Sequence, residues 1–137
     1  MECNSNHFKA YFNRGFAYDK IGQIDKAIHD YTKALQIDPY NAYCYYNRGI
    51  SYDKKGESEE GVKNFTKAIE IDGTKADFYS NRGFSFRKLK KYKEAIDDYS
   101  EAISLNPSIC ALNQITSVPI ITEHYVTRKL VICKRNK

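Results

Sequence analysis

The tripeptide Asn13-Arg14-Gly15 occurs again as Asn47-Arg48-Gly49 and a third time as Asn81-Arg82-Gly83, each copy 34 residues after the previous one. Other columns keep the same register far from the tripeptide, namely Tyr11, Tyr45 and Tyr79, Lys20, Lys54 and Lys88, and Ala34, Ala68 and Ala102. A fixed period of this length is typical of repeat proteins. The sequence therefore predicts three copies of one structural unit.

The apolar residues inside each unit have helical spacing. Large side chains recur every three or four positions from Tyr11 to Tyr18, and again from Ile24 to Leu35, which indicates two amphipathic helices per unit. Neither helix can bury its apolar stripe alone, so we expect the units to stack into an all-α superhelical solenoid.

Turn residues lie between the expected helices. Gly22 and Gly56 lie where the first helix turns into the second, but Lys90 replaces this glycine in the third unit. That turn must form without a positive φ or with a different cap. The second helices should end at Asp38-Pro39, Asp72-Gly73 and Asn106-Pro107.

A series of residues along the first unit resembles the tetratricopeptide repeat (TPR) consensus, which runs aromatic, Leu-Gly, Tyr, Ala, Phe, Ala and Pro. The matching residues are Tyr11, Gly15, Tyr18, Ala27, Tyr31, Ala34 and Pro39. The resemblance implies a right-handed superhelical solenoid with repeats at 8–41, 42–75 and 76–109. It implies a TPR domain over 8–107, after a lead-in of residues 1–7. The sequence departs from the family pattern where Arg14, Arg48 and Arg82 replace the usual leucine.

Residues 108–137 form a basic, β-branched C-terminal tail and are a candidate for disorder. Their net charge is +4, whereas residues 1–107 carry +1. Pro119 and the missing glycine argue against a fourth unit. Either residues 109–115 cap the last helix pair, or the tail is a foreign terminus, and we favour the second interpretation.

The sequence contains no candidate catalytic constellation, so we expect no enzyme activity, no cofactor, no metal site and no small-molecule substrate. Asp97-Asp98 is expected to lie on a solvated helix face. The cysteines have no disulfide or metal spacing, no signal peptide is visible, and no run is long enough to cross a membrane. We therefore expect a reducing, cytoplasmic setting, with Cys44 as a small buried residue.

The resemblance places the first helix of each unit along a concave groove that binds another protein. The groove-facing stripe contains an asparagine in every copy, apolar residues and a row of lysines, and the predicted partner-binding residues are Lys9, Phe12, Asn13, Phe16, Lys20, Tyr43, Tyr46, Asn47, Ile50, Lys54, Asn81, Phe84 and Lys88. Each asparagine amide offers two donors and an acceptor to a peptide backbone. We therefore expect a protein–protein interaction module or scaffold that binds a peptide or helix.

Two alternatives remain open. Some family members hold the C-terminal carboxylate of Hsp70 and Hsp90 chaperones in a clamp whose positions correspond here to Phe12, Phe16, Asn47, Asp77 and Asn81. Only Asn47 matches the clamp, and Asp77 would repel an anion, so chaperone binding would need a non-clamp mode. The other alternative is a tether in which the basic tail binds nucleic acid or membrane, although the body lacks the basic stripe expected of nucleic-acid binding.

The arginine column replaces a residue that the family normally buries, and burying an unpaired guanidinium is costly. We therefore expect each stem to pack while its head reaches an edge or a carboxylate. Asp38 and Asp72 share the period of the repeat and end the helices just before the second and third units. They are the expected partners of Arg48 and Arg82.

Overall fold

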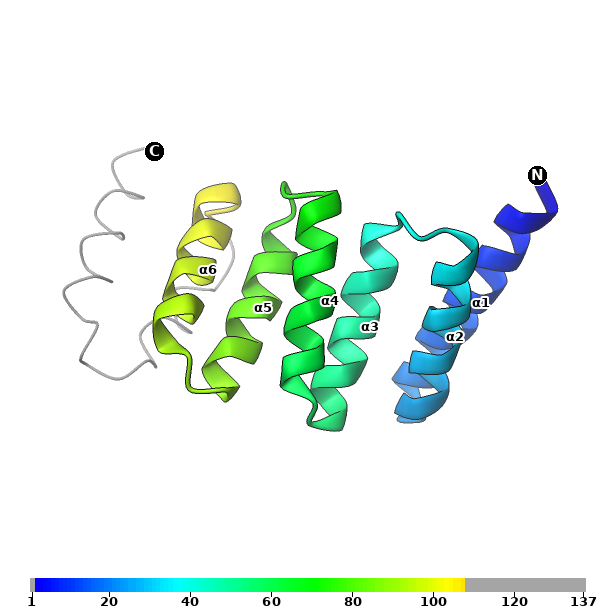
Figure 1. Ribbon diagram of the computed structural model, residues 1–137, viewed down its shortest axis with the longest axis horizontal. Helices are drawn as coiled ribbons and strands as arrows, with labels where there is room; N and C mark the ends of the chain where they lie inside the picture. The colour runs from blue at the N-terminus through cyan, green and yellow to red at the C-terminus, as the bar shows by residue number, and fades with distance from the viewer. Residues whose placement is uncertain (1, 108–137) are drawn as a thin grey trace. The chain divides into compact units, whose positions relative to one another are not determined.

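The computed structural model describes residues 2–107, and the predictions for the tail, as a cap, a foreign terminus or a tether, lie outside this range. The described residues form six helices and no strand (Figure 1): α1 Glu2–Lys20, α2 Ile24–Ile37, α3 Ala42–Lys55, α4 Ser58–Ile71, α5 Ala76–Lys88 and α6 Tyr92–Leu105. This confirms the all-α helical-repeat solenoid fold. The residues expected as a lead-in continue α1, which begins at Glu2.

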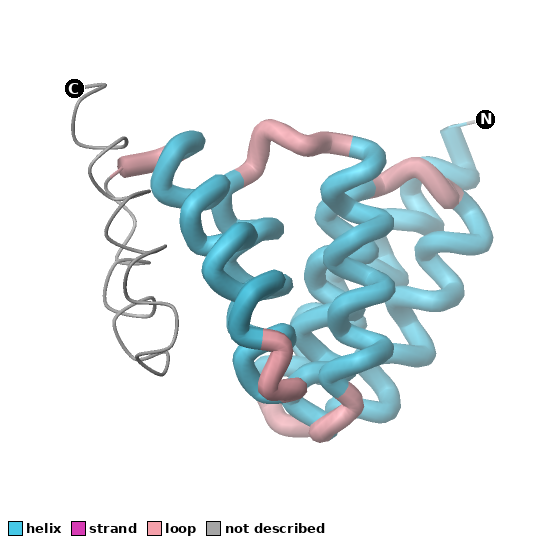
Figure 2. The backbone as a smooth tube through the Cα atoms, turned by 60° about the vertical axis from the view of Figure 1, so that its left-hand side comes forward, coloured by secondary structure: helices cyan, strands magenta, loops and turns pink. Residues whose placement is uncertain are grey.

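Helices end where the sequence predicts. The second helices of the three repeats stop before Asp38, Asp72 and Asn106, whose backbones are extended. Figure 2 shows the short loops that connect successive helices within each repeat. At the start of α3, the side chain of Asn41 accepts a hydrogen bond from the backbone N–H of Cys44 (3.0 Å), which satisfies one of the donors that a helix N-terminus leaves open.

The turns inside the repeats all use the left-handed backbone region. Gly22 and Gly56 have φ of 82° and 93°, and Lys90 has φ of 61°. The possibility that the third turn forms without a positive φ is therefore wrong. A side chain with a Cβ is disfavoured in this region, so Lys90 retains the geometry of the turn at a cost that glycine does not carry.

The chain divides into two compact units, Met1–Gly73 and Thr74–Lys137. The first unit holds repeats one and two, whose hydrophobic core contains Ala27, Tyr31, Ala34, Leu35 and Cys44. In the second unit, the fully buried large side chains are Phe78, Ile96 and Tyr99. Each core forms because the apolar stripes of paired helices face one another.

Glycine in the repeated tripeptide allows the two helices of a repeat to approach closely. A Cβ built at Gly49 would lie 2.8 Å from Cε1 of Phe65 on α4. The corresponding atoms at Gly15 and Gly83 would lie 3.1 Å from the rings of Tyr31 and Tyr99. The aromatic ring of the second helix therefore occupies the space that a side chain on the first helix would need.

Among the described residues, no helix is both long enough and apolar enough to span a membrane.

Candidate functional site

The predicted groove residues of α1 divide into buried and exposed side chains. Phe12 packs into the core, with its ring centroid 5.8 Å from that of Tyr31. Phe16 is 44% exposed, which is high for a large apolar side chain. Lys9 and Asn13 are also exposed. Of the two predicted groove aromatics on α1, Phe16 is therefore the one that remains available to a ligand.

The α3 residues divide in the same way. Tyr46 packs against Phe65 of α4, with ring centroids 5.9 Å apart. Tyr43 is 51% exposed and lies edge-on to Tyr46, at 6.4 Å between centroids. Ile50 is half-buried. Each first helix of the first unit thus carries one exposed aromatic, and on α3 this aromatic lies against a second one that packs on α4.

The lysine row is not uniform. Lys54 forms an ion pair with Asp19 of α1, and the Ser51 hydroxyl donates to the other oxygen of that carboxylate (2.5 Å). Asp19 is only 8% exposed, and these two partners satisfy a carboxylate that would be costly to bury alone. Lys20 instead places its ammonium 5.0 Å from the Phe16 ring centroid. Lys54 therefore links the two repeats, while Lys20 keeps its charge at the surface beside Phe16.

The repeated asparagines have part of their hydrogen-bonding capacity in use. Asn47 donates from Nδ2 to the carbonyl of Tyr43 (2.9 Å), and Asn81 donates likewise to the carbonyl of Asp77 (2.9 Å). Each of these contacts lies within one helix and uses an N–H of the side-chain amide. The side chain retains an acceptor for a ligand N–H.

The remaining predicted groove residues, Asn81, Phe84 and Lys88, lie on α5 in the second unit. The Phe84 ring lies beneath the Arg87 guanidinium and the Lys88 ammonium, 4.8 and 4.7 Å from its centroid. Such contacts are worth about 0.5–1 kcal/mol at exposed sites. The joining of these residues to those of α1 and α3 in one groove stays a prediction.

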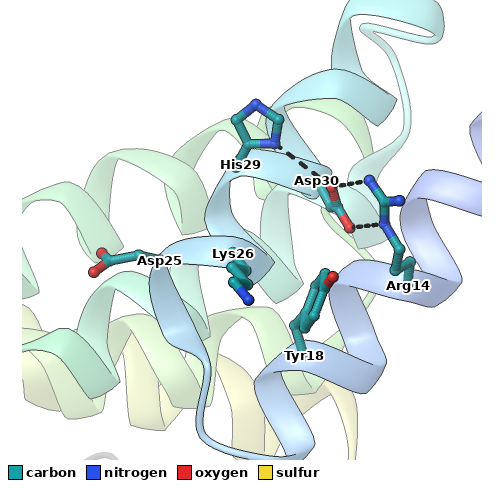
Figure 3. A pocket seen from close by; sticks show the side chains of 6 residues that line it. All are labelled: Arg14, Tyr18, Asp25, Lys26, His29 and Asp30. Atoms are coloured by element: carbon teal, nitrogen blue, oxygen red, sulfur yellow. Dashed lines mark hydrogen bonds and ion pairs between the residues drawn. The ribbon is translucent and has the colours of Figure 1, made fainter.

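The arginine column pairs within each repeat, sixteen residues along the chain. Arg14 donates from Nε and Nη2 to the two oxygens of Asp30 (2.6 and 2.9 Å), and Arg82 does the same to Asp98 (both 2.7 Å). Figure 3 shows the Arg14 fork reaching from α1 to α2. Two parallel hydrogen bonds between charged groups are strong and directional.

In the second repeat this pair has an amide acceptor. Arg48 donates from Nε to Oδ1 of Asn64 (2.7 Å) and from Nη1 to the hydroxyl of Thr32 in the preceding repeat (3.2 Å). The prediction that Asp38 pairs with Arg48 is therefore wrong, because the fork is used by α4 and α2. The prediction of an Arg82–Asp72 pair spans the two units and stays a prediction.

The prediction that Asp97-Asp98 lies on a solvated face is wrong for one member. Asp97 is exposed, whereas Asp98 is 5% exposed and holds Arg82. Burial raises the pKa of Asp98, against the hydrogen bonds from Arg82. For the more open pair, the hydrogen bond from Arg14 lowers the pKa of Asp30 below its ordinary value.

Sequence reasoning missed two sets of residues, Asp19 and the acceptor column of Asp30, Asn64 and Asp98. The acceptor column was visible as a second 34-residue series that lies sixteen residues after each arginine. The prediction for Cys44 is confirmed, since it is fully buried. Burial raises the pKa of its thiol to about 12.

Comparison with known families matches the tetratricopeptide repeat model to residues 8–41, 42–75 and 76–109. The chain belongs to the tetratricopeptide repeat family. The matched repeats coincide with those that the sequence predicts, and the buried Gly–aromatic pairs correspond to columns of the TPR consensus. No curated protein sequence matches the chain.

Several solved TPR domains are similar to the chain. The first TPR domain of Spaghetti (RPAP3), solved with the HSP90 peptide SRMEEVD, is 29% identical over 83% of this chain and 91% of its own, with a TM-score of 0.81. The second TPR domain of human RPAP3, solved with the HSP70 peptide SGPTIEEVD, is 28% identical over 84% and 97%, with a TM-score of 0.80. The Arabidopsis OM64 TPR domain is 28% identical over 82% and 93%, with a TM-score of 0.79.

The described residues contain no group of three or more histidine, cysteine or acidic side chains that could hold a metal ion.

Proposed function

We propose that this TPR protein is an adaptor that binds an extended peptide segment of a protein partner along the α1 and α3 face of the first unit. The observation that carries the proposal is the exposure of Phe16 and Tyr43, one on each first helix. Exposed aromatics supply large contact area at low conformational cost and are common binding hot spots.

The surrounding polar groups suit a peptide backbone. Asn13 and Asn47 stand on the same two helices as the aromatics, and Oδ1 of Asn47 remains as an acceptor for a backbone N–H. Lys9 and Lys20 add positive charge at the exposed surface of α1. The expected ligand thus carries an apolar side chain for the aromatics and no cationic residue beside it.

The solved relatives favour a second candidate, a chaperone C-terminus. Two similar TPR domains were solved with peptides that end in EEVD. Here two positions that correspond to the clamp do not match it, because they hold the apolar side chains of Phe12, which is core-packed, and Phe16, which is exposed. The chain therefore lacks part of the charge that an anionic terminus needs, and chaperone binding would use the exposed aromatics instead.

The proposal involves binding without catalysis and a cytoplasmic setting. The described residues offer acids and bases that pair with one another, as in the Arg14–Asp30 fork, rather than a nucleophile beside a free base. Cys44, the described cysteine thiol, is buried and free, which fits the reducing environment of the cytoplasm.

A peptide-library selection against the full chain tests the proposal, with SRMEEVD and SGPTIEEVD included as chaperone probes. Binders are measured again with Phe16→Ala and Tyr43→Ala. Each loss of an aromatic anchor costs about 2 kcal/mol, and affinity should fall more than tenfold. Tyr40→Ala is the matched control, because Tyr40 is a 79% exposed aromatic between α2 and α3. Equal losses in all three variants would refute the proposed face.

A further inference from the structure

Among residues 2–107, no helix packs on the side of α1 that faces away from the second repeat. We call this side the outward face. It carries the α1 side chains at the repeat positions whose α3 counterparts lie toward the first repeat: Ala10, Tyr11, Arg14, Ala17, Tyr18 and Ile21. Ala10 and Ala17 are exposed and Ile21 is 67% exposed. These apolar groups sit on one side of a helix because they follow its period.

The second repeat shows what covers this surface when a neighbour is present. The residues of α3 that match Ala10 and Ala17 are Cys44 and Ser51, and both are fully buried against the first repeat. The thiol of Cys44 donates to the carbonyl of Tyr31 on α2 (3.5 Å). The same columns are therefore an interface on α3 and an open surface on α1.

Arg14 shows the same difference at one atom. Arg48 uses its Nη1 for the Thr32 hydroxyl of the preceding helix, after its Nε has bonded its own repeat. Arg14 uses Nε and Nη2 for Asp30, and among the described residues its Nη1 has no hydrogen-bond acceptor. The Arg14 side chain is 56% exposed. The outward face thus presents a donor at the position where, one repeat along, Arg48 of α3 meets Thr32 of α2.

Two hollows flank Arg14 and would receive side chains of an incoming helix. One of about 320 Å³ is lined by His7, Ala10, Tyr11, Arg14 and Ile37. The other, of about 300 Å³, is lined by Arg14, Tyr18, Asp25, Lys26, His29 and Asp30 (Figure 3). Figure 3 shows Lys26 of α2 facing Tyr18 of α1, with its ammonium 5.4 Å from the ring centroid, and Arg14 reaching Asp30 nearby.

We infer that the outward face binds an amphipathic helix of a partner protein that presents the surface of α2. Such a helix carries a Thr, Ser or carboxylate to accept from Arg14, with aliphatic side chains one turn before and after it, as Thr32 has Ile28 and Leu35. The α2–α3 interface of this chain supplies the template, because it brings together the same columns one repeat along. This site is separate from the peptide groove, so the chain would hold two protein segments at once.

The probe is a synthetic peptide of residues 23–38, made helical by replacing His29 with Glu and joining it to Lys33 through a lactam. Both positions are exposed on α2, and the link is needed because a free helix of this length is marginal in water. The peptide is titrated into the full chain and followed by backbone NMR. Amide shifts should concentrate around Ala10, Ala17 and Ile21.

Variants separate this surface from others. Ala17→Glu, and independently Ala10→Glu, should weaken peptide binding at least tenfold, because each puts a charge against the apolar face of the probe. Gln36→Glu, an exposed position of α2 that makes the same charge change, should leave binding within twofold of wild type. A peptide with Thr32→Val should bind several-fold more weakly, because Arg14 loses its acceptor. Circular dichroism checks that each variant stays folded.

Four outcomes would overturn the inference. The peptide could cause no shift at the outward face, or shift α3 residues such as Cys44 and Tyr45 by displacing α2. Binding could be unchanged in both glutamate variants. Sedimentation of the chain without peptide could show self-association that Ala17→Glu abolishes, in which case the occupant is a second copy and not a partner helix.

Discussion

The outward face of α1 is open, whereas the matching face of α3, which carries the same repeat positions, is covered by the first repeat. Cys44 and Ser51 are fully buried, whereas Ala10 and Ala17 are exposed. Arg48 joins two repeats, while Arg14 serves one. Each unit of a repeat protein carries half of an interface in its own sequence, so a first helix that is uncovered among the described residues presents a specific surface rather than a neutral one.

The arginine pairs differ in a second way, in how far they are removed from water. The side chains of Arg14 and Asp30 are 56% and 2% exposed, and those of Arg82 and Asp98 are 19% and 7% exposed. In the middle repeat the acceptor is neutral, because Asn64 replaces the carboxylate. The same arginine position is therefore found in a partly exposed ion pair, in a buried ion pair and in a hydrogen bond to a neutral amide.

The largest expected effect concerns the close approach that all repeats share. Gly49→Leu should abolish the cooperative folding of the first unit, because a Cβ at this position already meets Phe65 at 2.8 Å. Gly49→Ala should destabilise more than Gly15→Ala, where the nearest ring atom is at 3.1 Å. Thermal unfolding by circular dichroism measures the order, and a reversed order would contradict the packing argument.

The loss of stability on removing an arginine should depend on whether its partner is a carboxylate or an amide. Arg82→Met should cost about 3 kcal/mol, because it leaves the Asp98 carboxylate buried without its cation. Arg48→Met should cost about 1 kcal/mol, because its hydrogen bonds are to neutral groups. Urea unfolding curves of the two variants give the difference. Equal costs would mean that the charge of the acceptor is unimportant.

Acid should weaken the first repeat through Asp30. The hydrogen bond from Arg14 lowers the folded-state pKa of this carboxyl, so its contribution is present above the unfolded pKa of about 3.9 and is lost as the pH falls through the folded value. Asp30→Asn should lower stability at neutral pH and flatten the dependence on pH below about 4. Unfolding midpoints of wild type and variant across this range test the sign.

The smallest effect is expected at the turn of the third repeat. Lys90→Gly should stabilise the chain by about 0.5–1 kcal/mol, because Lys90 has a positive φ that the glycines of the other turns adopt without strain. Lys91 has φ of −88°, and Lys91→Gly should give no gain. A Lys90→Gly variant that is no more stable than Lys91→Gly would show that the turn is unstrained.

The helices could be predicted from sequence because their determinants are local. Apolar spacing places each helix, and residues such as Asp38, which follow the last helical turn, end it. The close approach at Gly49 was also visible, since a periodic glycine inside a helical pattern indicates contact between backbones. The fold required only the period and these local signals.

The contacts of the site depend on which helix faces which, and the period alone does not decide this. Asp38 and Asp30 both lie in columns that repeat with Arg48 and Arg14, but the Arg14 fork bonds Asp30 on its facing helix, and Arg48 bonds Asn64 and Thr32 rather than Asp38. Likewise, Lys54 forms an ion pair with Asp19, which lies 35 residues earlier in the preceding repeat. A lysine row read along the sequence therefore overstates the positive charge available to a ligand.

The most direct test of the central claim is to map a selected peptide onto the full chain by NMR. Shifts should concentrate on Asn13, Phe16, Tyr43 and Asn47, and affinity should change little between low and physiological salt, since aromatic and amide contacts are weakly screened. Shifts confined to residues 108–137, with affinity that falls steeply with salt, would move the function to the basic tail. Such a result would contradict the groove on α1 and α3.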